Sequence, residues 1–159
     1  MSVVEIGSNS DLYVRLFKDD DFEPVTRLWR EAREVSLPDF QREKGYPFEM
    51  DQVYFRNHIQ AKDEIWVVDK NSRPIAFMAI DKDFIDHLYV GPEYWRRGIG
   101  KMLLAHARTL SPKHLWLYTL QVNLNARVFY QKNGFVARKF GISPEPELEP
   151  DVEYHWYKS

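Results

Sequence analysis

The sequence predicts an α/β domain in which a mixed β-sheet carries helices on both faces. Alternating apolar segments indicate seven strands, and apolar residues spaced by three and four indicate four helices, in the order β-α-α-β-β-β-α-β-α-β-β. The segments 84–90, 98–110 and 115–122 make a strand–helix–strand unit, which favours parallel pairing of its two strands. The length of 159 residues fits a single domain, 1–159.

The first third of the chain is predicted to form one strand and two helices. Residues 12–17 alternate as a strand does, and residues 19–21 supply an N-cap and acidic first-turn residues for a helix. The apolar face of this helix has five members, Phe22, Val25, Leu28, Trp29 and Ala32. Pro38 and the segment 45–48 interrupt the pattern, and a second helix is expected over 49–60. Its inward-facing residues are expected to be Met50, Val53, Tyr54 and Ile59.

The middle of the chain predicts an antiparallel meander that leads into the strand–helix–strand unit. Residues 64–69 and 73–81 form a predicted hairpin, and 84–90 follows as a third strand. The helix over 98–110 ends before Pro112 and turns one set of apolar residues inward, namely Ile99, Met102, Leu103, Ala107 and Leu110. The remaining elements are a helix over 123–133 closed by Gly134, a strand over 135–141, a proline-rich loop over 142–151 and a strand over 152–158.

The composition excludes several classes of function. The net charge of −2 offers no basic field for nucleic acid. The absence of cysteine excludes disulfides, thiolate metal sites and a cysteine nucleophile. The five histidines are scattered without the spacing of a metal site, so no metal is expected. The N-terminus lacks a signal-peptide pattern and the apolar runs are too short to span a membrane, so a cytoplasmic protein without a membrane partner is expected.

The segment 95–101, Trp-Arg-Arg-Gly-Ile-Gly-Lys, lies between a predicted strand and a predicted helix. It is not a P-loop, because Trp95 stands where the first glycine is needed and Met102 where Ser or Thr is needed. It is not a dinucleotide fingerprint, because Leu103 replaces the third glycine. The amides that open a helix form an anion site, and glycine allows a phosphate to approach them closely. The segment therefore indicates an anion site, and the alternative is a tight loop with solvent-facing basic residues.

A second pattern, Asn-Leu-Asn-Ala-Arg-Val-Phe-Tyr-Gln-Lys-Asn-Gly-Phe, follows at 123–135. Taken alone, Ala126, Phe129 and Tyr130 are an apolar helix face. Taken with Leu-Tyr-Val-Gly-Pro-Glu-Tyr-Trp-Arg-Arg-Gly-Ile-Gly-Lys-Met-Leu-Leu at 88–104, the pattern resembles the GNAT family of N-acetyltransferases, in particular small bacterial members. The order of elements also matches over nearly the whole chain. The resemblance implies a twisted, mostly antiparallel seven-stranded sheet flanked by about four helices.

The resemblance also implies acetyl-CoA as the co-substrate and assigns residues to it. The strand residues Leu88, Tyr89 and Val90 would offer backbone groups to the pantetheine arm and the acetyl carbonyl. The pyrophosphate would be held by the amides of six successive residues, Arg96, Arg97, Gly98, Ile99, Gly100 and Lys101. Asn123 would bond the cofactor near the pantetheine. The sequence departs from the family pattern at Trp95, where Gln or Arg is usual, and Arg96 would supply the missing polar side chain.

The reaction implied is attack of a free amine on the acetyl thioester, by a transferase that forms a ternary complex. Tyr130 would lie beside the thioester sulfur and act as general acid, because a phenol keeps its proton at pH 7. The tetrahedral intermediate would meet a strand amide near Tyr89 or Val90. The base is either Asp86 or His87, which strand alternation places on opposite faces, and a water chain is an alternative. Glu64 and Asp81 are weaker candidates.

The acceptor is expected to be a small-molecule amine or a protein amino group, with the small molecule preferred. The acidic residues of the loop 144–153 would attract a cationic amine, or are simply solvated; they are Glu145, Glu147, Glu149, Asp151 and Glu153. Four aromatic residues would floor the acceptor pocket: Trp29, Tyr46, Phe48 and Tyr54. A second hypothesis is a CoA-binding regulatory or interaction module without turnover. A homodimer is also open, because many such domains pair through sheet edges or helices.

Overall fold

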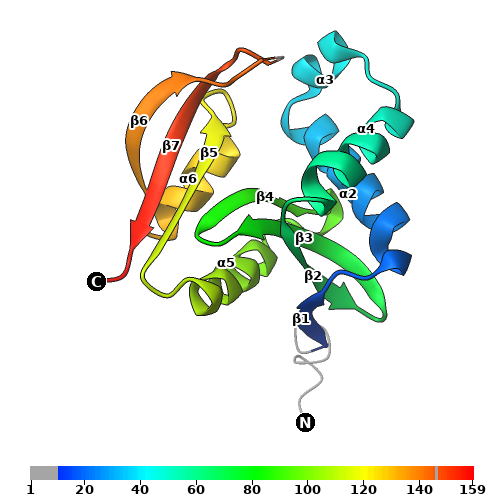
Figure 1. The fold of residues 1–159 in the computed structure, drawn as a ribbon, viewed down its shortest axis with the longest axis horizontal. Helices are drawn as coiled ribbons and strands as arrows, with labels where there is room; N and C mark the ends of the chain where they lie inside the picture. Colours follow the sequence, from blue (N-terminus) through cyan, green and yellow to red (C-terminus); the bar gives the residue numbers. More distant parts are fainter. Residues whose placement is uncertain (1–10, 146) are drawn as a thin grey trace.

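The computed structural model describes residues 11–145 and 147–159, without the side chains of residues 40, 41 and 43. These residues form a seven-stranded sheet in the order β1-β2-β3-β4-β5-β7-β6, shown in Figure 1. The strands are β1 Leu12–Leu16, β2 Glu64–Lys70, β3 Arg73–Asp81, β4 Phe84–Val90, β5 His114–Leu120, β6 Val136–Ile142 and β7 Pro150–Tyr157. The α-helices are α2 Phe22–Ser36, α3 Pro38–Lys44, α4 Phe48–Tyr54, α5 Ile99–Leu110 and α6 Leu124–Lys132. Short turns η1 Asp19–Asp21, η2 Phe55–Gln60 and η3 Pro92–Tyr94 join them. The N-terminal segment considered for a signal peptide lies mostly outside the described residues.

The sheet has one parallel pair, β4 with β5, and its other pairs are antiparallel. The predicted meander and the strand–helix–strand unit are therefore confirmed. β4 and β5 pair only at Phe84 and Trp116, next to the bond from the Trp116 amide to the Asp83 carbonyl at 3.0 Å. Beyond this point the strands separate, and Figure 1 shows β5, β6 and β7 turning away from β4. The edge of β4 that faces β5 is thus left largely without a strand partner.

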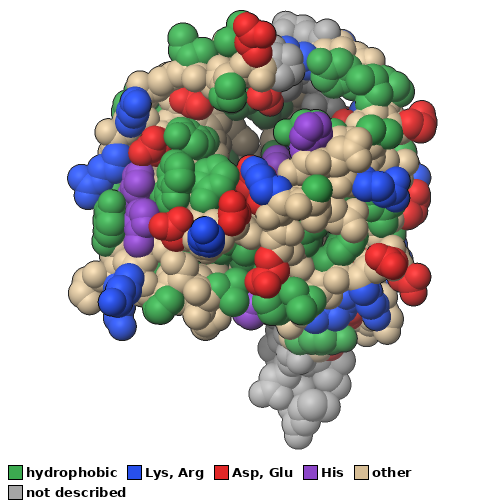
Figure 2. All heavy atoms as spheres, in the orientation of Figure 1, with side chains coloured by type: hydrophobic (Ala, Val, Ile, Leu, Met, Phe, Trp, Pro, Cys, Tyr) green, Lys and Arg blue, Asp and Glu red, His purple; other side chains and the backbone are tan. Residues whose placement is uncertain are grey.

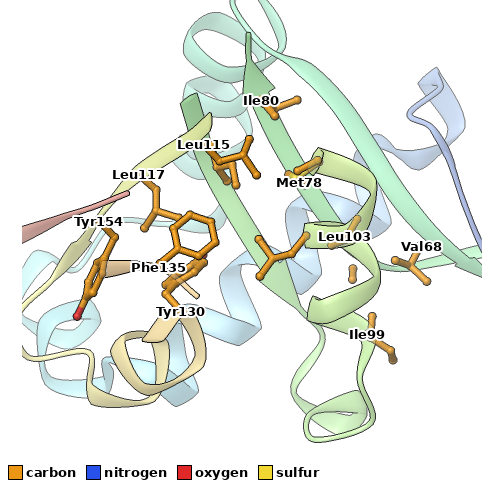
Figure 3. Packing of buried hydrophobic residues seen from close by; sticks show 14 of the residues in the cluster. Val68, Met78, Ile80, Ile99, Leu103, Leu115, Leu117, Tyr130, Phe135 and Tyr154 are labelled. Carbon is orange, nitrogen blue, oxygen red and sulfur yellow. The ribbon is translucent and has the colours of Figure 1, made fainter. Parts of the chain in front are cut away.

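Helices cover both faces of the sheet, as predicted. On one face α2 and η2 pack Val25, Trp29 and Phe55 against β2 and β3. On the other face α5 and α6 contribute to a larger apolar cluster, seen in Figure 3. In α5 the buried residues are Ile99, Leu103, Leu104 and Ala107. The predicted inward position of Leu110 is wrong, because this residue is largely exposed at the end of the helix.

The predicted helix over 49–60 is α4 followed by the π-helical turn η2, and its predicted inner face is wrong. Met50, Val53 and Tyr54 are 50%, 56% and 49% exposed, whereas Ile59 is buried as expected. Asp51 takes the inner position in α4. Its carboxylate contacts two α2 guanidinium groups, Arg30 at 2.9 Å and Arg33 at 2.7 Å. Ion pairing allows a carboxylate to occupy a buried position, which an apolar periodicity cannot predict.

A further difference lies between α2 and α4. The sequence predicts a break from Pro38 onward, but Pro38 opens the short helix α3. Proline suits the first turn of a helix, because the amide that it lacks would have no partner there.

Among the described residues, no helix is long and apolar enough to cross a membrane.

Candidate active site

A β-bulge in β4 brings Asp86 and His87 to the same cavity. Ala79 of β3 pairs with His87 and Ile80 pairs with Ile85, so Asp86 is the extra residue. A bulge interrupts the alternation of side chains along a strand. The prediction that Asp86 and His87 lie on opposite faces, with at most one at the site, is therefore wrong. Both line the cavity, and the Asp86 carboxylate lies 3.7 Å from His87 Nε2.

The environment of these two groups sets their protonation. Burial lowers the pKa of His87 to about 4, so its imidazole is neutral at pH 7. Lys62 Nζ lies 3.1 Å from the Asp86 carboxylate. Although burial opposes it, the hydrogen bond with Asp63 and the nearby positive groups hold the pKa of Asp86 below its usual value. Asp86 is thus an ionised carboxylate beside a neutral imidazole.

The cavity has a volume of about 910 Å³ and extends from the α2 and α4 side of β4 to the β5–β7 half of the sheet. Figure 2 shows the surface hollowed between these two halves. Trp29, Tyr46 and Tyr54 line the cavity, as the fold resemblance led us to expect. Phe48 does not, because its ring packs under the Arg27 guanidinium at 4.7 Å. The walls are therefore aromatic on the helical side.

Acidic side chains of the loop and strand after β6 line the opposite wall. They are Glu147, Asp151 and Glu153, whereas Glu145 and Glu149 are not part of the lining. Glu153 is held by His155 Nε2 at 2.7 Å, and this bond lowers the pKa of Glu153. Asp151 is 8% exposed. Lys139 of β6 lines the same side, so a cationic group in the cavity would face three carboxylates and one lysine there.

The free edge of β4 presents backbone groups to the gap between β4 and β5. The amide of Gly91 donates to the Ile75 carbonyl at 2.9 Å. Because bonding alternates along an antiparallel ladder, Tyr89 bonds to Phe77 on β3, and the amides of Leu88 and Val90 face the gap. The carbonyl of Val90 accepts a bond from Trp95 Nε1 at 2.7 Å. Of the three predicted strand residues, Leu88 and Val90 thus turn backbone groups toward the gap, and Tyr89 does not.

In the loop from Pro92 to Gly98, the amides of Tyr94 and Trp95 donate to the carbonyls of Gly91 and Pro92, so the candidate anion site begins at Arg96. Arg96 and Gly98 have positive φ values of 65° and 80°. Backbone of alternating handedness makes an anion-binding concavity. Helical bonding begins with the Met102 amide, which donates to the Gly98 carbonyl at 3.2 Å. The amides that precede it at the start of α5 are not used within the helix.

Three details explain the composition of this loop and of the start of α5. A Cβ on Gly100 would lie 2.8 Å from Phe129 Cζ, so glycine allows α6 to pack closely against α5. The side chain of Ile99 is buried in the core, so only its backbone is available to a ligand. The unusual Trp95 closes the loop onto the end of β4 through its bond to Val90. Arg96, Arg97 and Lys101 have exposed side chains.

Tyr130 lies in α6 and Asn123 directly precedes this helix; of the two, only Asn123 lines the cavity. Tyr130 is packed edge to face against Phe135 with ring centroids 5.5 Å apart, and Figure 3 shows it within the apolar cluster. Burial, and then the nearby Tyr89 phenol, raise the pKa of Tyr130. Asn123 lines the cavity, and its Oδ1 accepts a bond from the Ala126 amide at 3.2 Å as the N-cap of α6. Only its amide nitrogen is then left for a ligand.

Sequence reasoning missed several charged residues of the site, among them Arg33, Lys62 and Asp63. Arg33 lies over the Trp29 ring at 4.0 Å and lines the cavity. Lys62 and Asp63 stand just before β2, at the same end of the site as Asp86. The sequence feature that could have identified Lys62 and Asp63 is a run of charged residues directly before an apolar strand. Such a run is also common in turns, so it does not by itself indicate a site. No group of three or more potential metal ligands occurs within residues 11–145 and 147–159.

Known proteins share both the sequence pattern and the fold. A family model described as an acetyltransferase (GNAT) domain matches residues 61–137. The uncharacterized N-acetyltransferase YafP of Escherichia coli is 35% identical over 130 residues, which cover 79% of this chain and 82% of YafP. The peptidyl-lysine N-acetyltransferase YjaB of Salmonella typhimurium is 29% identical over 123 residues, with 77% and 81% covered.

Solved structures agree with this assignment at the level of the fold. Apo YjaB of Escherichia coli has a TM-score of 0.79 at 19% identity and covers 93% of this chain and 99% of its own. The PaiA N-acetyltransferase of Thermoplasma acidophilum, solved with coenzyme A, has a TM-score of 0.67 at 20% identity, with 92% and 99% covered. The chain therefore belongs to the GNAT family and is an acetyl-CoA-dependent N-acetyltransferase.

Proposed function

We propose that the acetyl group passes directly to the primary amine of a lysine side chain, within a ternary complex of protein, acetyl-CoA and acceptor. The separation of β4 from β5 is the observation that carries this proposal. The separation leaves the edge of β4 unpaired, between the backbone amides at the start of α5 and a cavity that is lined by carboxylates. The aromatic wall suits the aliphatic stem of a lysine, and the acidic wall suits its ammonium group. The name of the relative YjaB also supports a lysine acceptor.

The acyl-CoA side of the site would be built from backbone. The pyrophosphate would bind at the start of α5, on the amides of residues 96–101. The pantetheine arm would lie along the β4 edge and bond to Leu88 and Val90, and the amide nitrogen of Asn123 would donate to it from α6. The Trp95 indole occupies the Val90 carbonyl, so the Val90 amide is the group of that residue left for the ligand.

The acceptor side would supply the proton transfer. An alkyl ammonium has a pKa of about 10.4, so the amine must lose a proton before it attacks. Asp86 would take this proton, with the neutral His87 beside it as a relay. The amine nitrogen then bonds to the acetyl carbon, and the developing oxyanion would meet the Leu88 amide, because the pantetheine arm takes the Val90 amide.

Collapse of the tetrahedral intermediate breaks the carbon–sulfur bond. Tyr130 would donate a hydrogen bond to the departing sulfur, because its raised pKa keeps the phenol protonated. The nitrogen of the intermediate gives up its second proton and the sulfur takes up one through Tyr130, so the products are the acetylated amine and the free thiol. We further propose that residues 1–159 act as a single cytoplasmic domain, since the described strands share one sheet and the sequence has no cysteine.

The test is an acceptor panel with the purified protein and acetyl-CoA. One arm contains peptides with an internal lysine, a second contains matched peptides whose lysine is replaced by arginine, and a third contains small diamines. Free-thiol release and mass spectrometry of the acceptors are measured. The proposal expects acetylation of the lysine peptides alone or at much higher kcat/KM. Acetylation confined to the diamines contradicts the lysine assignment, and no transfer to any amine contradicts the whole proposal.

A further inference from the structure

Asp63 is a buried carboxyl group that the mechanism above does not use. It lies just before β2, where the amides of Lys62 and Asp63 donate to the Ile59 carbonyl at 3.2 Å and 2.8 Å. These bonds fix the backbone that carries its side chain. Asp63 is 8% exposed, and both carboxylate oxygens lack a hydrogen-bond donor among the described residues. An ionised carboxylate in such a position is strongly disfavoured.

Asp63 directly follows Lys62, whose Nζ lies 3.1 Å from the Asp86 carboxylate, and after burial the interaction with Asp86 is the strongest influence on the pKa of Asp63. Two carboxylates have no donor between them, so this interaction is favourable only if one proton lies between the oxygens. Burial, and then the bond with Asp86, raise the pKa of Asp63 to about 8. The same bond contributes to the lowered pKa of Asp86. At neutral pH the pair therefore holds one proton and one negative charge.

The charged and titratable groups around the pair come from four elements. Lys62 precedes β2 and contacts Asp86, and Asp81 at the end of β3 acts on Asp63 through its charge. Tyr54 of α4 faces Lys62 and Asp86. His87 of β4 is neutral at pH 7, and Arg33 of α2 faces it. Lys62 is thus the cation that balances the single negative charge of the pair.

We propose that Asp63 is a positioning residue that acts through Asp86, and that the two form a carboxyl pair whose loss of the shared proton creates the base for the acceptor ammonium. This inference rests on the proposed transfer to an amine. With the shared proton in place, Asp86 is hydrogen bonded and is a weak proton acceptor. Once the shared proton has been lost, one proton moves from the ammonium nitrogen to Asp86 and is then shared with Asp63. The neutral amine attacks, and the proton leaves to solvent after the product departs.

The test compares kcat/KM of the unmodified protein and of Asp63→Asn from pH 6 to pH 9, with one lysine peptide. The asparagine amide can still donate to Asp86 but cannot release a proton. The ratio of the two rate constants cancels the ionisation of the acceptor amine. We expect this ratio to rise about tenfold between pH 7 and pH 9, since the deprotonated fraction of a group with a pKa of about 8 rises about tenfold over this range. A ratio that stays constant with pH overturns the inference.

Asp81→Asn is the matched control, because it removes a neighbouring exposed charge without touching the hydrogen bond to Asp86. The ratio of kcat/KM for Asp81→Asn to kcat/KM for Asp63→Asn should still rise with pH, but at lower pH than in the unmodified protein. Acetyl-CoA affinity measured by calorimetry should be unchanged in both variants, which also shows that they are folded. If this rise is also lost in Asp81→Asn, the pH dependence cannot be assigned to the Asp63–Asp86 pair, and the inference is overturned.

A second measurement needs no variant. The side-chain ¹³C signals of the aspartates are followed by NMR in the unmodified protein as the pH is raised. We expect the Asp63 and Asp86 signals to respond together near pH 8. Completion of both titrations below about pH 5, the ordinary range of exposed carboxyls, overturns the shared proton. This readout does not depend on turnover, so failure of the pair is distinguishable from failure of the amine-transfer proposal.

Discussion

The two sides of the gap between β4 and β5 differ in the groups that they offer to a ligand: one side offers backbone groups and the other offers side chains. On the α5 side, the candidate ligand groups belong to the backbone: the residues from Arg96 to the start of α5, and the free edge of β4. On the cavity side, the surface is made of side chains, with Asp86 and Glu153 as examples. A backbone site depends on glycine positions and tolerates changes such as Trp95. A side-chain site depends on each residue and on its partners.

The largest expected effect is at Tyr130. Tyr130→Phe removes the hydroxyl that we propose to hydrogen bond the leaving sulfur, and leaves the packing against Phe135 in place. We expect kcat to fall by about 10²-fold or more, with the acetyl-CoA dissociation constant changed less than about twofold. Steady-state kinetics and calorimetry measure the two quantities. A variant with unchanged kcat would assign Tyr130 to the core alone.

Substitution in the loop should affect acetyl-CoA binding before it affects chemistry. Gly98 has a φ of 80°, and a β-branched residue disfavours this conformation. We expect Gly98→Val to weaken acetyl-CoA binding by about tenfold, which corresponds to about 1.4 kcal/mol and matches the strain of a left-handed residue. Calorimetry with acetyl-CoA measures the change.

Arg96→Ala is the matched comparison, because it changes an exposed side chain of the same loop. If the amides hold the pyrophosphate, this variant should lose only about two- to threefold in affinity, the contribution expected of one exposed charge. A larger loss in Arg96→Ala than in Gly98→Val would mean that side chains hold the ligand, and the contrast between the two sides would fail.

The same contrast explains what the sequence could predict. The glycine spacing and the pattern at 123–135 are local, so they identified the strand–loop–helix and α6 with their places in the fold. The bulge at Asp86 depends on the pairing of β3 with β4, which no local pattern contains. The cavity joins α2, the residues before β2 and the loop after β6, which are distant in the sequence. Asp51 and Asp63 were missed because their burial depends on partners from other elements.

A smaller effect is expected in the wall of the cavity. Asp51 is 5% exposed and pairs with Arg30 and Arg33. Asp51→Asn should lower the free energy of unfolding by about 2 kcal/mol, the usual contribution of hydrogen bonds to charged groups. It should also raise the acceptor KM, because Arg33 loses the partner that orients it in the cavity. Chemical denaturation and initial-rate kinetics measure the two changes.

Asp39→Asn is the control for this change, because Asp39 and its partner Arg42 are both exposed. Its effect on the free energy of unfolding should be about 0–1 kcal/mol. Equal effects of the two substitutions would contradict a structural role for the buried pair.

A last effect concerns the pH dependence of stability through His87. Its pKa in the folded protein is about 4, below the unfolded value of about 6.5. As the pH falls from about 6.5 to about 4, the unfolded chain takes up a proton that the folded protein does not, so stability decreases over this window. His87→Gln should lose this part of the decrease. Denaturation midpoints between pH 7 and pH 4 measure it, and an identical decline in both proteins would contradict the assigned burial of the imidazole.

Direct transfer across the gap is most directly tested by initial rates measured over a matrix of acetyl-CoA and lysine-peptide concentrations. If the thioester and the amine occupy the two sides together, double-reciprocal plots intersect, and mass spectrometry finds no acetylated enzyme when the acceptor is omitted. Parallel lines together with a covalent acetyl-enzyme would mean that the acetyl group reaches the amine in two separate steps, and would contradict a site in which both substrates meet at β4.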